Sequence, residues 1–503
     1  MKQEQMKVKK QAYLILLSVL FLKGIAFGAC MGSDRELPIR AALELNIGES
    51  QEVKLTNGEI VRIKLLEITD KRDTYRNAIR GSEIKISVDD EMVTLNSGNY
   101  NLPVTVGKVQ IDCPVIKNYY SNTNQDRWGL SKDARFRLWP KGSPYMKPGT
   151  FVYPIKQEWL ASLSQAGNEP TYADWGESRE SSIYYHSGFD IGGAEGMDEI
   201  VSATDGLVIS SNNLTLDGYT DFPGDVRPDV VYIKDSRGWV FRYSHLDSVL
   251  PEIQPGVNVK AGQKIGYIGK QGQSGGWVHL HFEIKHKETS SGEWGTEDPY
   301  IYAWEAYNRQ YRPSLMAVAR PHQIAWVGEP VALNGSKSRS FEGDITSFEW
   351  QFSDGTAAMG PVQKKIYDRP GEYSEILKVT DSKGNVDYDF MVVQVFGPEN
   401  SEHSIPAIHA AFHPTLDIEP GEPVTFLART FNGGAGNEIW DFGDGSPTVE
   451  TQSEPVNRKA SSKGEFAKTI HSFSKAGHYI VRVKRENEYG YTATGLLHVV
   501  VDK

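Results

Sequence analysis

The sequence predicts a mainly β protein divided into several domains. Its 503 residues are too many for one hydrophobic core, so about three or four are expected. The 48 glycines and 25 prolines favour turn-rich β structure, and long amphipathic helices are hard to find. After an N-terminal segment at 1–30, the expected domains are 31–127, 128–311 (with a core at 184–300), 312–397 and 398–503.

The first thirty residues are typical of a signal peptide for export. Lysines precede an apolar stretch from Ala12 to Leu22, and small residues lead to Cys30. At about 1.5 Å per residue this stretch falls short of a bilayer core of about 30 Å, so a permanent spanning helix is the weaker alternative. Phe27–Cys30 resembles the lipobox of bacterial lipoproteins, which implies that Cys30 is acylated and anchors the protein to a membrane. We therefore expect an exported protein, either lipid-anchored in the cell envelope or secreted after ordinary cleavage.

Charge and cysteine content exclude two classes of protein. The formal net charge of -11 repels phosphate backbones, and no basic stripe with interleaved aromatic residues is present, so nucleic acid is not expected as a partner. With Cys30 lipidated, Cys113 is the one other cysteine, which leaves no internal disulfide framework. Cys113 follows a Val- and Ile-rich stretch and is predicted to be a small buried hydrophobic residue.

A small β domain is predicted between about Leu43 and Ile116. Apolar and polar residues alternate over 51–56 and 59–64 with Asn57-Gly58 between them, a pattern typical of a β-hairpin with a two-residue turn. The segment contains no histidine, so its expected role is packing or substrate positioning. Farther along the chain, 157–166 is a candidate short helix that leads into the next domain.

Candidate metal ligands concentrate between positions 186 and 286, which hold five of the twelve histidines. The run His186-Ser-Gly-Phe-Asp190 is unsuited to a helix because a glycine is at its centre, and residues four apart on an extended segment face the same side. In His279-Leu-His281 the two histidines also share a face, while Val278, Leu280 and Phe282 supply the buried one.

Two histidines and one aspartate fit a three-ligand zinc site whose fourth position stays open, as in catalytic sites. Bound zinc lowers the pKa of water to about 7 and polarises a carbonyl, so a hydroxide nucleophile becomes available at neutral pH. Nearby imidazoles can then move protons.

Three motifs, in this order, resemble the lysostaphin/LytM-type zinc endopeptidases. They are His-x-Gly-x-Asp at 186–190, Tyr-x-His-Leu at 243–246 and His-Leu-His-Phe-Glu at 279–283, with similar glycines between them. The resemblance implies an antiparallel β catalytic domain with a duplicated hybrid motif. It also implies that His186, Asp190 and His281 hold Zn2+, and that His245 and His279 are the catalytic histidines, without deciding which activates water and which protonates the leaving group.

The chain departs from that family outside the motifs. The stretch from Asn212 to Pro228 is long and polar, and Pro228-Asp229 replaces a usual Gly-Asn, so this loop is predicted to reshape the cleft. Tyr184 and Tyr185 are both candidates for an assisting tyrosine, and the spacing selects neither.

A repeat predicts two related β-sandwiches at the C-terminal end. The run from Phe348 through Trp350 to Gly355 returns as Glu438 through Trp440 to Gly445. Both copies resemble PKD domains, which are immunoglobulin-like sandwiches with a Trp-x-Phe-Gly-Asp-Gly turn. The two tryptophans are expected in the sandwich cores rather than as platforms for glycans.

The other histidines have simpler interpretations. His286, between two lysines, is expected at the solvated end of its strand. His403, His409 and His413 lie between the predicted sandwiches without tight spacing, which indicates a linker.

The function that follows is an exported zinc metalloendopeptidase that hydrolyses peptide bonds in peptidoglycan cross-links or stem peptides. One alternative is a catalytically silent regulator of cell-wall amidases, which loss of the zinc ligands would mark. The other is a secreted peptidase that acts on extracellular protein, with the sandwiches as anchors.

Overall fold

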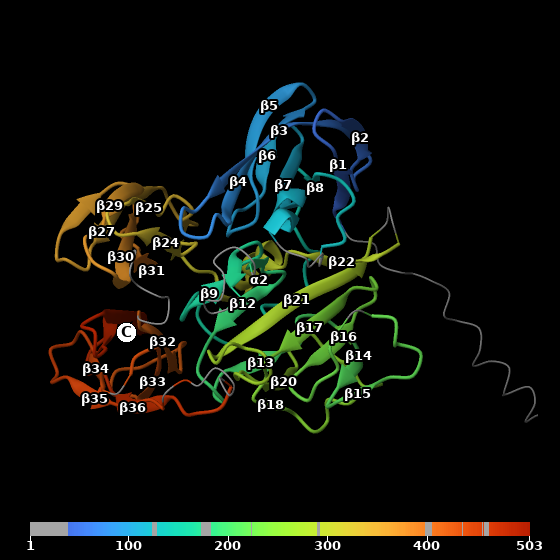
Figure 1. Ribbon diagram of the computed structural model, residues 1–503. Helices are drawn as coiled ribbons and strands as arrows, with labels where there is room; N and C mark the ends of the chain where they lie inside the picture. The colour runs from blue at the N-terminus through green and yellow to red at the C-terminus, as the bar shows by residue number, and fades with distance from the viewer. Residues whose placement is uncertain are drawn as a thin grey trace, which may run out of the picture. The chain divides into compact units, whose positions relative to one another are not determined.

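The structure is a computed structural model that describes residues 39–122, 128–172, 183–222, 224–288, 292–397, 405–434, 436–454, 456 and 462–502. The predicted signal peptide and Cys30 lie outside these residues. Almost all regular structure in the described part is β, as predicted, with the helix α2 (Tyr300–Tyr311) and the short 3-10 helix η1 (Lys117–Asn122) (Figure 1). Within the described ranges, no helix combines the length and the apolar character needed to cross a membrane.

The N-terminal region contains two four-stranded sheets, with strand orders β2-β3-β4-β5 and β1-β8-β7-β6. On β3 the residues Val61, Ile63 and Leu65 are fully buried and alternate with exposed positions, which is the period-two pattern of a strand with one face in a core. Cys113 is 1% exposed, so the predicted buried residue is confirmed. The strands are β1 (Ala41–Leu45), β2 (Ser50–Lys54), β3 (Ile60–Arg72), β4 (Ile79–Val88), β5 (Glu91–Asn96), β6 (Val104–Val106), β7 (Val109–Ile116) and β8 (Ala134–Pro140).

The predicted hairpin is confirmed, but its turn differs. Strands β2 and β3 pair antiparallel from Ser50 opposite Lys64 to Lys54 opposite Ile60. The Gly58 amide donates to Leu55 O at 2.9 Å, and Gly58 has a φ of 91°. Three residues thus form the loop, with glycine in the left-handed position, instead of the two-residue turn expected from Asn-Gly.

The central region is built on one large antiparallel sheet with the order β15-β14-β16-β17-β21-β12-β9. Strand β21 lies near the middle of this sheet, between β12 and β17 (Figure 1). A smaller sheet has the order β13-β20-β18, and β10 pairs with β11. The strands are β9 (Ser164–Gln165), β10 (Pro170–Tyr172), β11 (Ile183–Tyr185), β12 (Phe189–Gly192), β13 (Glu199–Val201), β14 (Gly206–Ser211), β15 (Leu214–Thr215), β16 (Val231–Lys234), β17 (Val240–Ser244), β18 (Ser248–Val249), β19 (Asn258–Val259), β20 (Lys264–Tyr267), β21 (His279–Lys287) and β22 (Trp294–Glu297).

The helix predicted over 157–166 is wrong. Turns and bends occupy this segment, and its end joins the sheet as β9. Leu160 has a φ of 53°, a left-handed conformation that an α-helix does not contain. The Trp159 ring packs 5.6 Å from the Tyr153 ring and 5.3 Å from the Tyr307 ring, so tertiary contacts decide the conformation over local propensity.

Two β-sandwiches follow α2. The first pairs the sheet β24-β31-β30-β27-β28 with β25-β29, and the second pairs β32-β33-β36 with β35-β34-β37-β38. Trp350 and Trp440 are fully buried, which confirms their prediction as core residues. The strands are β23 (Leu315–Met316), β24 (Gln323–Trp326), β25 (Pro330–Asn334), β26 (Arg339–Ser340), β27 (Ile345–Gln351), β28 (Ala357–Met359), β29 (Val362–Ile366), β30 (Gly371–Asp381), β31 (Val386–Phe396), β32 (Ala407–His413), β33 (Val424–Phe431), β34 (Glu438–Asp441), β35 (Val449–Thr451), β36 (Ala467–His471), β37 (Gly477–Glu486) and β38 (Thr492–Val501).

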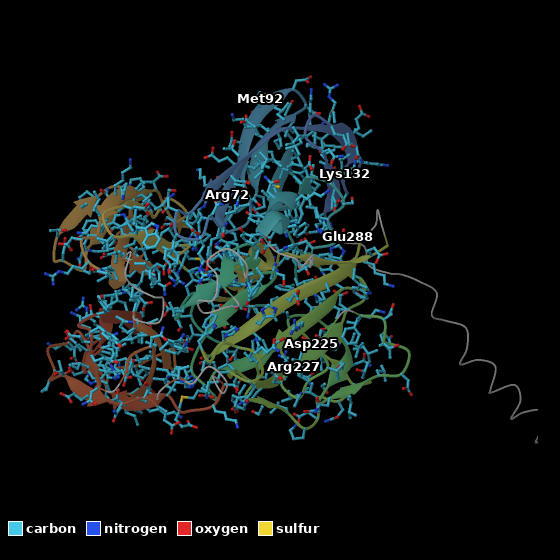
Figure 2. All side chains as sticks on the ribbon, in the orientation of Figure 1. Arg72, Met92, Lys132, Asp225, Arg227 and Glu288 are labelled. Carbon is cyan, nitrogen blue, oxygen red and sulfur yellow. The ribbon has the colours of Figure 1, made fainter. Side chains whose placement is uncertain are left out.

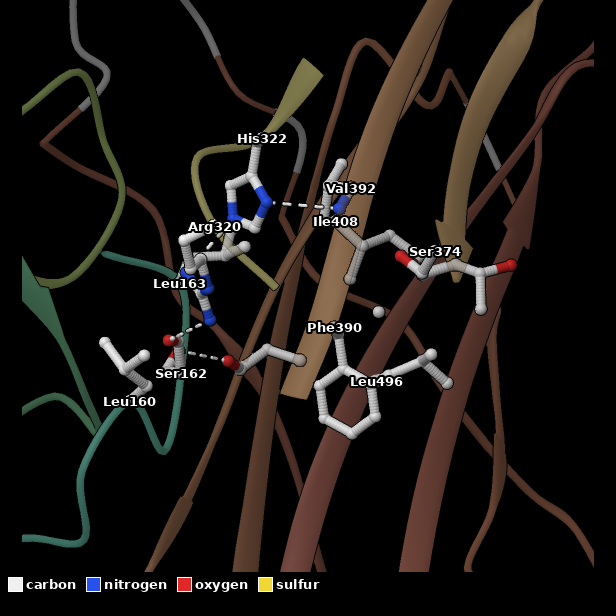
Figure 3. Close-up of a pocket in the computed structure, with 13 residues that line it drawn as sticks. Leu160, Ser162, Leu163, Arg320, His322, Ser374, Phe390, Val392, Ile408 and Leu496 are labelled. Carbon is white, nitrogen blue, oxygen red and sulfur yellow. Dashed lines mark hydrogen bonds between the residues drawn. The ribbon is translucent and has the colours of Figure 1, made fainter. Parts of the chain in front are cut away.

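Contacts join the central region to both sandwiches. Arg320, at the start of the first sandwich, donates to Ser164 Oγ at 3.0 Å and makes an ion pair with Asp389 at 3.2 Å. The Ser162 hydroxyl donates to Ala410 O of the second sandwich at 2.6 Å. Arg320, Ser162 and Ala410 line a small pocket, together with Leu160, Ser374 and Leu496 (Figure 3).

Candidate metal centre

The pairing of β12 with β21 brings predicted site residues onto one face of the sheet. Asp190 is opposite His281, and Gly192 is opposite His279. Because side chains alternate along a strand, these positions share a face, while Leu280 and Phe282 point into the core, fully buried. His186 precedes β12, and its amide donates to Glu169 O at 3.0 Å, which fixes the approach of the chain.

Three ligand atoms converge at this point. His186 Nε2 lies 3.0 Å from Asp190 Oδ1 and 3.1 Å from His281 Nδ1, and His281 Nδ1 lies 2.8 Å from Asp190 Oδ1. These three residues form the one group of histidine, cysteine and carboxylate side chains in the described residues whose geometry suits a metal ion.

The orientation of the two imidazoles favours a cation between them. His186 Nδ1 lies 3.3 Å from Ala166 O, so the proton belongs on Nδ1 and the lone pair of Nε2 points into the cluster. His281 Nδ1 also faces the cluster, 2.8 Å from Asp190 Oδ1, while its Nε2 lies 3.7 Å from Glu283 Oε2, beyond hydrogen-bond distance. Two ring nitrogens and a carboxylate oxygen thus converge, which is the donor set of a metal site.

The charges in the cluster also favour a cation at this point. Burial lowers the pKa of His186, but the Asp190 carboxylate outweighs it, so the pKa is raised above its usual value. Burial would raise the pKa of Asp190, yet the surrounding histidines hold it well below its usual range. The centre therefore carries a carboxylate that favours positive charge beside it.

Two further histidines flank the group. His279 Nε2 lies 3.5 Å from Asp190 Oδ2, and the His245 and His279 rings are 4.7 Å apart. The His245 Nδ1 atom bonds to Gln271 O at 2.7 Å, and the His279 Nδ1 atom to Trp277 O at 3.2 Å, so both rings present Nε2 as a base. Burial, followed by the charge of His279, lowers the pKa of His245 well below its usual value, and burial lowers the pKa of His279 to about 4. Both imidazoles are neutral at pH 7.

All five predicted residues are nearly buried. Their exposed fractions are 4% for His186, 5% for Asp190, 7% for His245, 3% for His279 and 8% for His281. The structure thus brings together every residue that the family resemblance selected, in a setting where electrostatic interactions are weakly screened.

Sequence reasoning missed the buried acidic residue beside His281. Glu283 is fully buried and accepts hydrogen bonds from the Ser187 hydroxyl at 3.0 Å and from Arg242 at 3.3 Å. Its place two residues after His281, on the same face of a predicted strand, was the available signal.

The polar loop before β16 also reaches a site residue. Arg227, near Asp225 in Figure 2, donates to Asp229 Oδ2 at 2.8 Å. Asp229 Oδ2 in turn accepts the amide of His245 at 3.3 Å. The substituted Pro228-Asp229 pair therefore holds the backbone of His245, which has a φ of 68°.

Two predictions about histidines are corrected, and one of the two candidate tyrosines is placed. His286 is 7% exposed and stacks on Trp239 with ring centroids 5.5 Å apart, because β22 covers the end of β21. His409 and His413 belong to the sandwich strand β32, not to a linker, and His403 lies outside the described residues. The Tyr185 hydroxyl accepts the Ile79 amide at 2.8 Å, so it serves the N-terminal core.

The fold and the site define a β protein with a candidate metal centre in its large sheet and two following sandwiches. Residues 184–292 match the model of peptidase family M23, and residues 312–395 and 411–500 match models of the PKD domain. The chain is similar to the lipoprotein NlpD of Yersinia enterocolitica, at 36% identity over 20% of this chain and 90% of that protein. The chain belongs to peptidase family M23.

Other relatives cover smaller shares of their own length. The murein hydrolase activator NlpD of Salmonella dublin is 36% identical over 21% of this chain and 24% of that protein, so the chain spans about a quarter of that relative. Among solved structures, the catalytic domain of the M23 protein EnpA from Enterococcus faecalis has 24% sequence identity and a TM-score of 0.19, over 31% of this chain and 94% of that one.

Proposed function

We propose that the chain is an exported zinc metalloendopeptidase that hydrolyses peptide bonds in peptidoglycan cross-links or stem peptides. The observation that carries this proposal is the convergence of His186 Nε2, His281 Nδ1 and Asp190 Oδ1 within 3.1 Å of one another, beside two neutral imidazoles. Two imidazoles and a carboxylate suit Zn2+, and a set of three protein ligands leaves the fourth position open, as in catalytic zinc sites.

A zinc ion in this site supplies Lewis acidity to a peptide carbonyl and to water. The protein's own work is to place bases and hydrogen-bond donors around that point. His245 and His279 present unprotonated Nε2 atoms that accept a proton and then deliver it to the leaving amine. The carbonyls of Ala166, Gln271 and Trp277 fix the tautomers of three of the rings, and Glu283 places a negative charge 3.7 Å from His281 Nε2.

The proposed substrate and location rest on the relatives and on the N-terminal sequence. The relatives named as a murein hydrolase activator and as a lipoprotein support a site of action at the cell wall. The predicted export signal, with Cys30 as the lipidated residue, supports attachment to the envelope.

A second candidate function is activation of a separate murein hydrolase without hydrolysis by this chain. Two observations favour it: the relatives carry that name, and the five site side chains are at most 8% exposed. The complete ligand set favours the peptidase, because an activator has no need for three convergent ligand atoms.

Digestion of purified sacculi separates the two functions. Protein carrying one equivalent of zinc should release fragments with new amine termini, identified by mass spectrometry of the muropeptides. His281→Ala should lose both the zinc and the release, whereas His478→Ala, at an exposed position in the second sandwich, should keep both. Sacculi left intact by zinc-loaded protein, but digested once an amidase is added, would favour the activator; full activity in His281→Ala would contradict the ligand set.

A further inference from the structure

An imidazole from the second sandwich lies on the face of the sheet that carries the metal centre. His409 is on β32, yet a Cβ atom placed on Gly192 would come within 3.3 Å of its Cε1 atom. Gly192 is directly opposite His279 and shares the face of Asp190. The same Cβ would lie 2.3 Å from Leu163 O and 3.1 Å from Ser162 Oγ, so the space beside Gly192 is shared by the segment before β9 and by His409, more than two hundred positions away in the sequence.

His409 reaches the catalytic pair through Trp277. The Trp277 ring stacks on the His279 ring with centroids 3.9 Å apart and an angle of 17° between the planes. The His409 ring meets Trp277 edge-on, with centroids 5.5 Å apart. His279 is thus held between Trp277 on one side and His245 on the other.

A second contact from the same sandwich fixes the turn before β21. Arg429, on β33, donates from its NH1 atom to Gly276 O at 2.9 Å. Gly276 has a φ of 89°, a conformation in which the peptide orientation depends on such partners. His409 and Arg429 therefore hold successive residues of the turn that leads into His279.

The surroundings of His409 are unusual for a core residue. It is 1% exposed, and among the described residues neither ring nitrogen makes a hydrogen bond of good geometry, although the Gly193 backbone lies near enough to act on the ring. Burying an unpaired polar atom costs about 1–3 kcal/mol, so an aliphatic side chain would suit simple packing better. Burial is the main cause that lowers the pKa of His409 to about 3, so the ring stays neutral and acts by its shape, wedged between Trp277 and Phe466.

The sandwich is fixed on the central region by contacts away from this point. His413 Nδ1 lies 2.7 Å from the buried Asp198 Oδ1. Ala411 and Leu427 belong to the same hydrophobic cluster as the core of the central sheet. Ser162 and Ile408 line the junction seen in Figure 3. His409 is consequently presented by a docked surface and not by a loose domain.

We propose that the second PKD domain completes the active site, with His409 and Arg429 as positioning residues that hold Trp277 against His279. This inference rests on the proposed function, because it assigns the sandwich a part in orienting a catalytic base. The sandwich is then required for turnover and is more than an anchor for the substrate.

The test uses the full chain labelled with 5-fluorotryptophan, with the Trp277 resonance assigned by Trp277→Phe. His409→Ala should shift or broaden that 19F resonance and lower the maximal rate of muropeptide release from sacculi by about tenfold, as small misplacements of catalytic groups do. Zinc content and the amount of protein that sediments with sacculi should not change. His409→Phe, which keeps a ring against Trp277, should recover most of the rate.

Controls separate positioning from folding and from failure of the proposed function. His478→Ala should match the wild-type chain in resonance and rate, and Arg429→Lys repeats the test if His409→Ala does not fold. An unmoved Trp277 resonance in His409→Ala would refute the contact, and a moved resonance with an unchanged rate would refute the positioning role. If the wild-type chain hydrolyses nothing, the proposed function fails while the resonance still decides whether the sandwich holds Trp277.

Discussion

Glu283 offers the sharpest test of how the metal centre is supported. Its carboxylate is fully buried and lies 3.0 Å from Lys285 Nζ, 3.3 Å from Arg242 NH1 and 3.7 Å from His281 Nε2. Burial would raise the pKa of Glu283, yet Lys285 and the other cations hold it well below its usual range, so the carboxylate is ionised. Glu283→Gln keeps the shape and removes the charge.

The expected cost follows from the charges left behind. Removing one partner of a buried ion pair costs about 3–5 kcal/mol, because Arg242 and Lys285 remain buried without their counter-charge. At about 2–4 °C per kcal/mol for a domain of this size, the melting temperature should fall by roughly 6–20 °C. Loss of the negative charge beside His281 Nε2 should also weaken zinc binding by about 10–100-fold.

Thermal unfolding and a zinc titration with a competing chelator measure the two effects. Glu252→Gln, an exposed position in the same region, is the matched control and should change neither. A Glu283→Gln chain with wild-type melting temperature would show that the ion cluster does not stabilise the sheet. Unchanged zinc affinity beside a lower melting temperature would remove Glu283 from the support of His281.

Three other predictions use different parts of the molecule. Burial raises the pKa of Glu372 from 4.5 to about 7, so between these pH values the folded chain holds a proton that the unfolded chain has lost. The free energy of unfolding should therefore fall as pH rises through this range, by at most about 3 kcal/mol. Chemical unfolding at several pH values should show a flatter profile for Glu372→Gln. A Cβ on Gly269 would lie 2.3 Å from the Asp247 amide nitrogen, so Gly269→Ala should lower the free energy of unfolding by more than about 2 kcal/mol. Gly206→Ala, whose Cβ would lie 2.7 Å from the nearest backbone atom, should lower it less in the same chemical unfolding experiment. The reverse order would show that the Asp247 backbone moves to accommodate the methyl group. Removing zinc with a chelator should lower the melting temperature by the equivalent of about 2–4 kcal/mol of stability. The melting temperature of His281→Ala should not respond to the chelator. An equal decrease in that variant would show that the metal binds elsewhere.

The sequence predicts those parts of the candidate site whose geometry is set by residues close together in the chain. A period of two on a strand places His279 and His281 on one face, and an extended segment does the same for His186 and Asp190. The pairing of Asp190 with His281 could not be derived that way, because register between β12 and β21 depends on the whole sheet. The family resemblance supplied the link that local pattern lacks.

Contacts that depend on the tertiary structure could not be predicted from the sequence. Arg242 meets Glu283 only because β17 pairs with β21, and His409 meets Trp277 only because the second sandwich docks on the central region. The wrong prediction of a helix at 157–166 has the same cause, since ring contacts around Trp159 decide the conformation of this segment. The hairpin at 50–64 was predictable because its two strands are neighbours in sequence.

The protonation of the site is set largely by the main chain. Three of the four imidazoles point Nδ1 at a backbone carbonyl, namely Ala166 O, Gln271 O and Trp277 O. A carbonyl is present whatever the residue type, so these contacts leave no mark in a sequence motif, and substituting the residues that carry them need not break them. What breaks them is a change in the path of the loops. The turn before His279 is where that path depends on another domain, because Gly276 O is held by Arg429 and the Trp277 ring by His409. The tautomer of His279, and with it the availability of its Nε2 atom as a base, is therefore tied to the docking of the second sandwich.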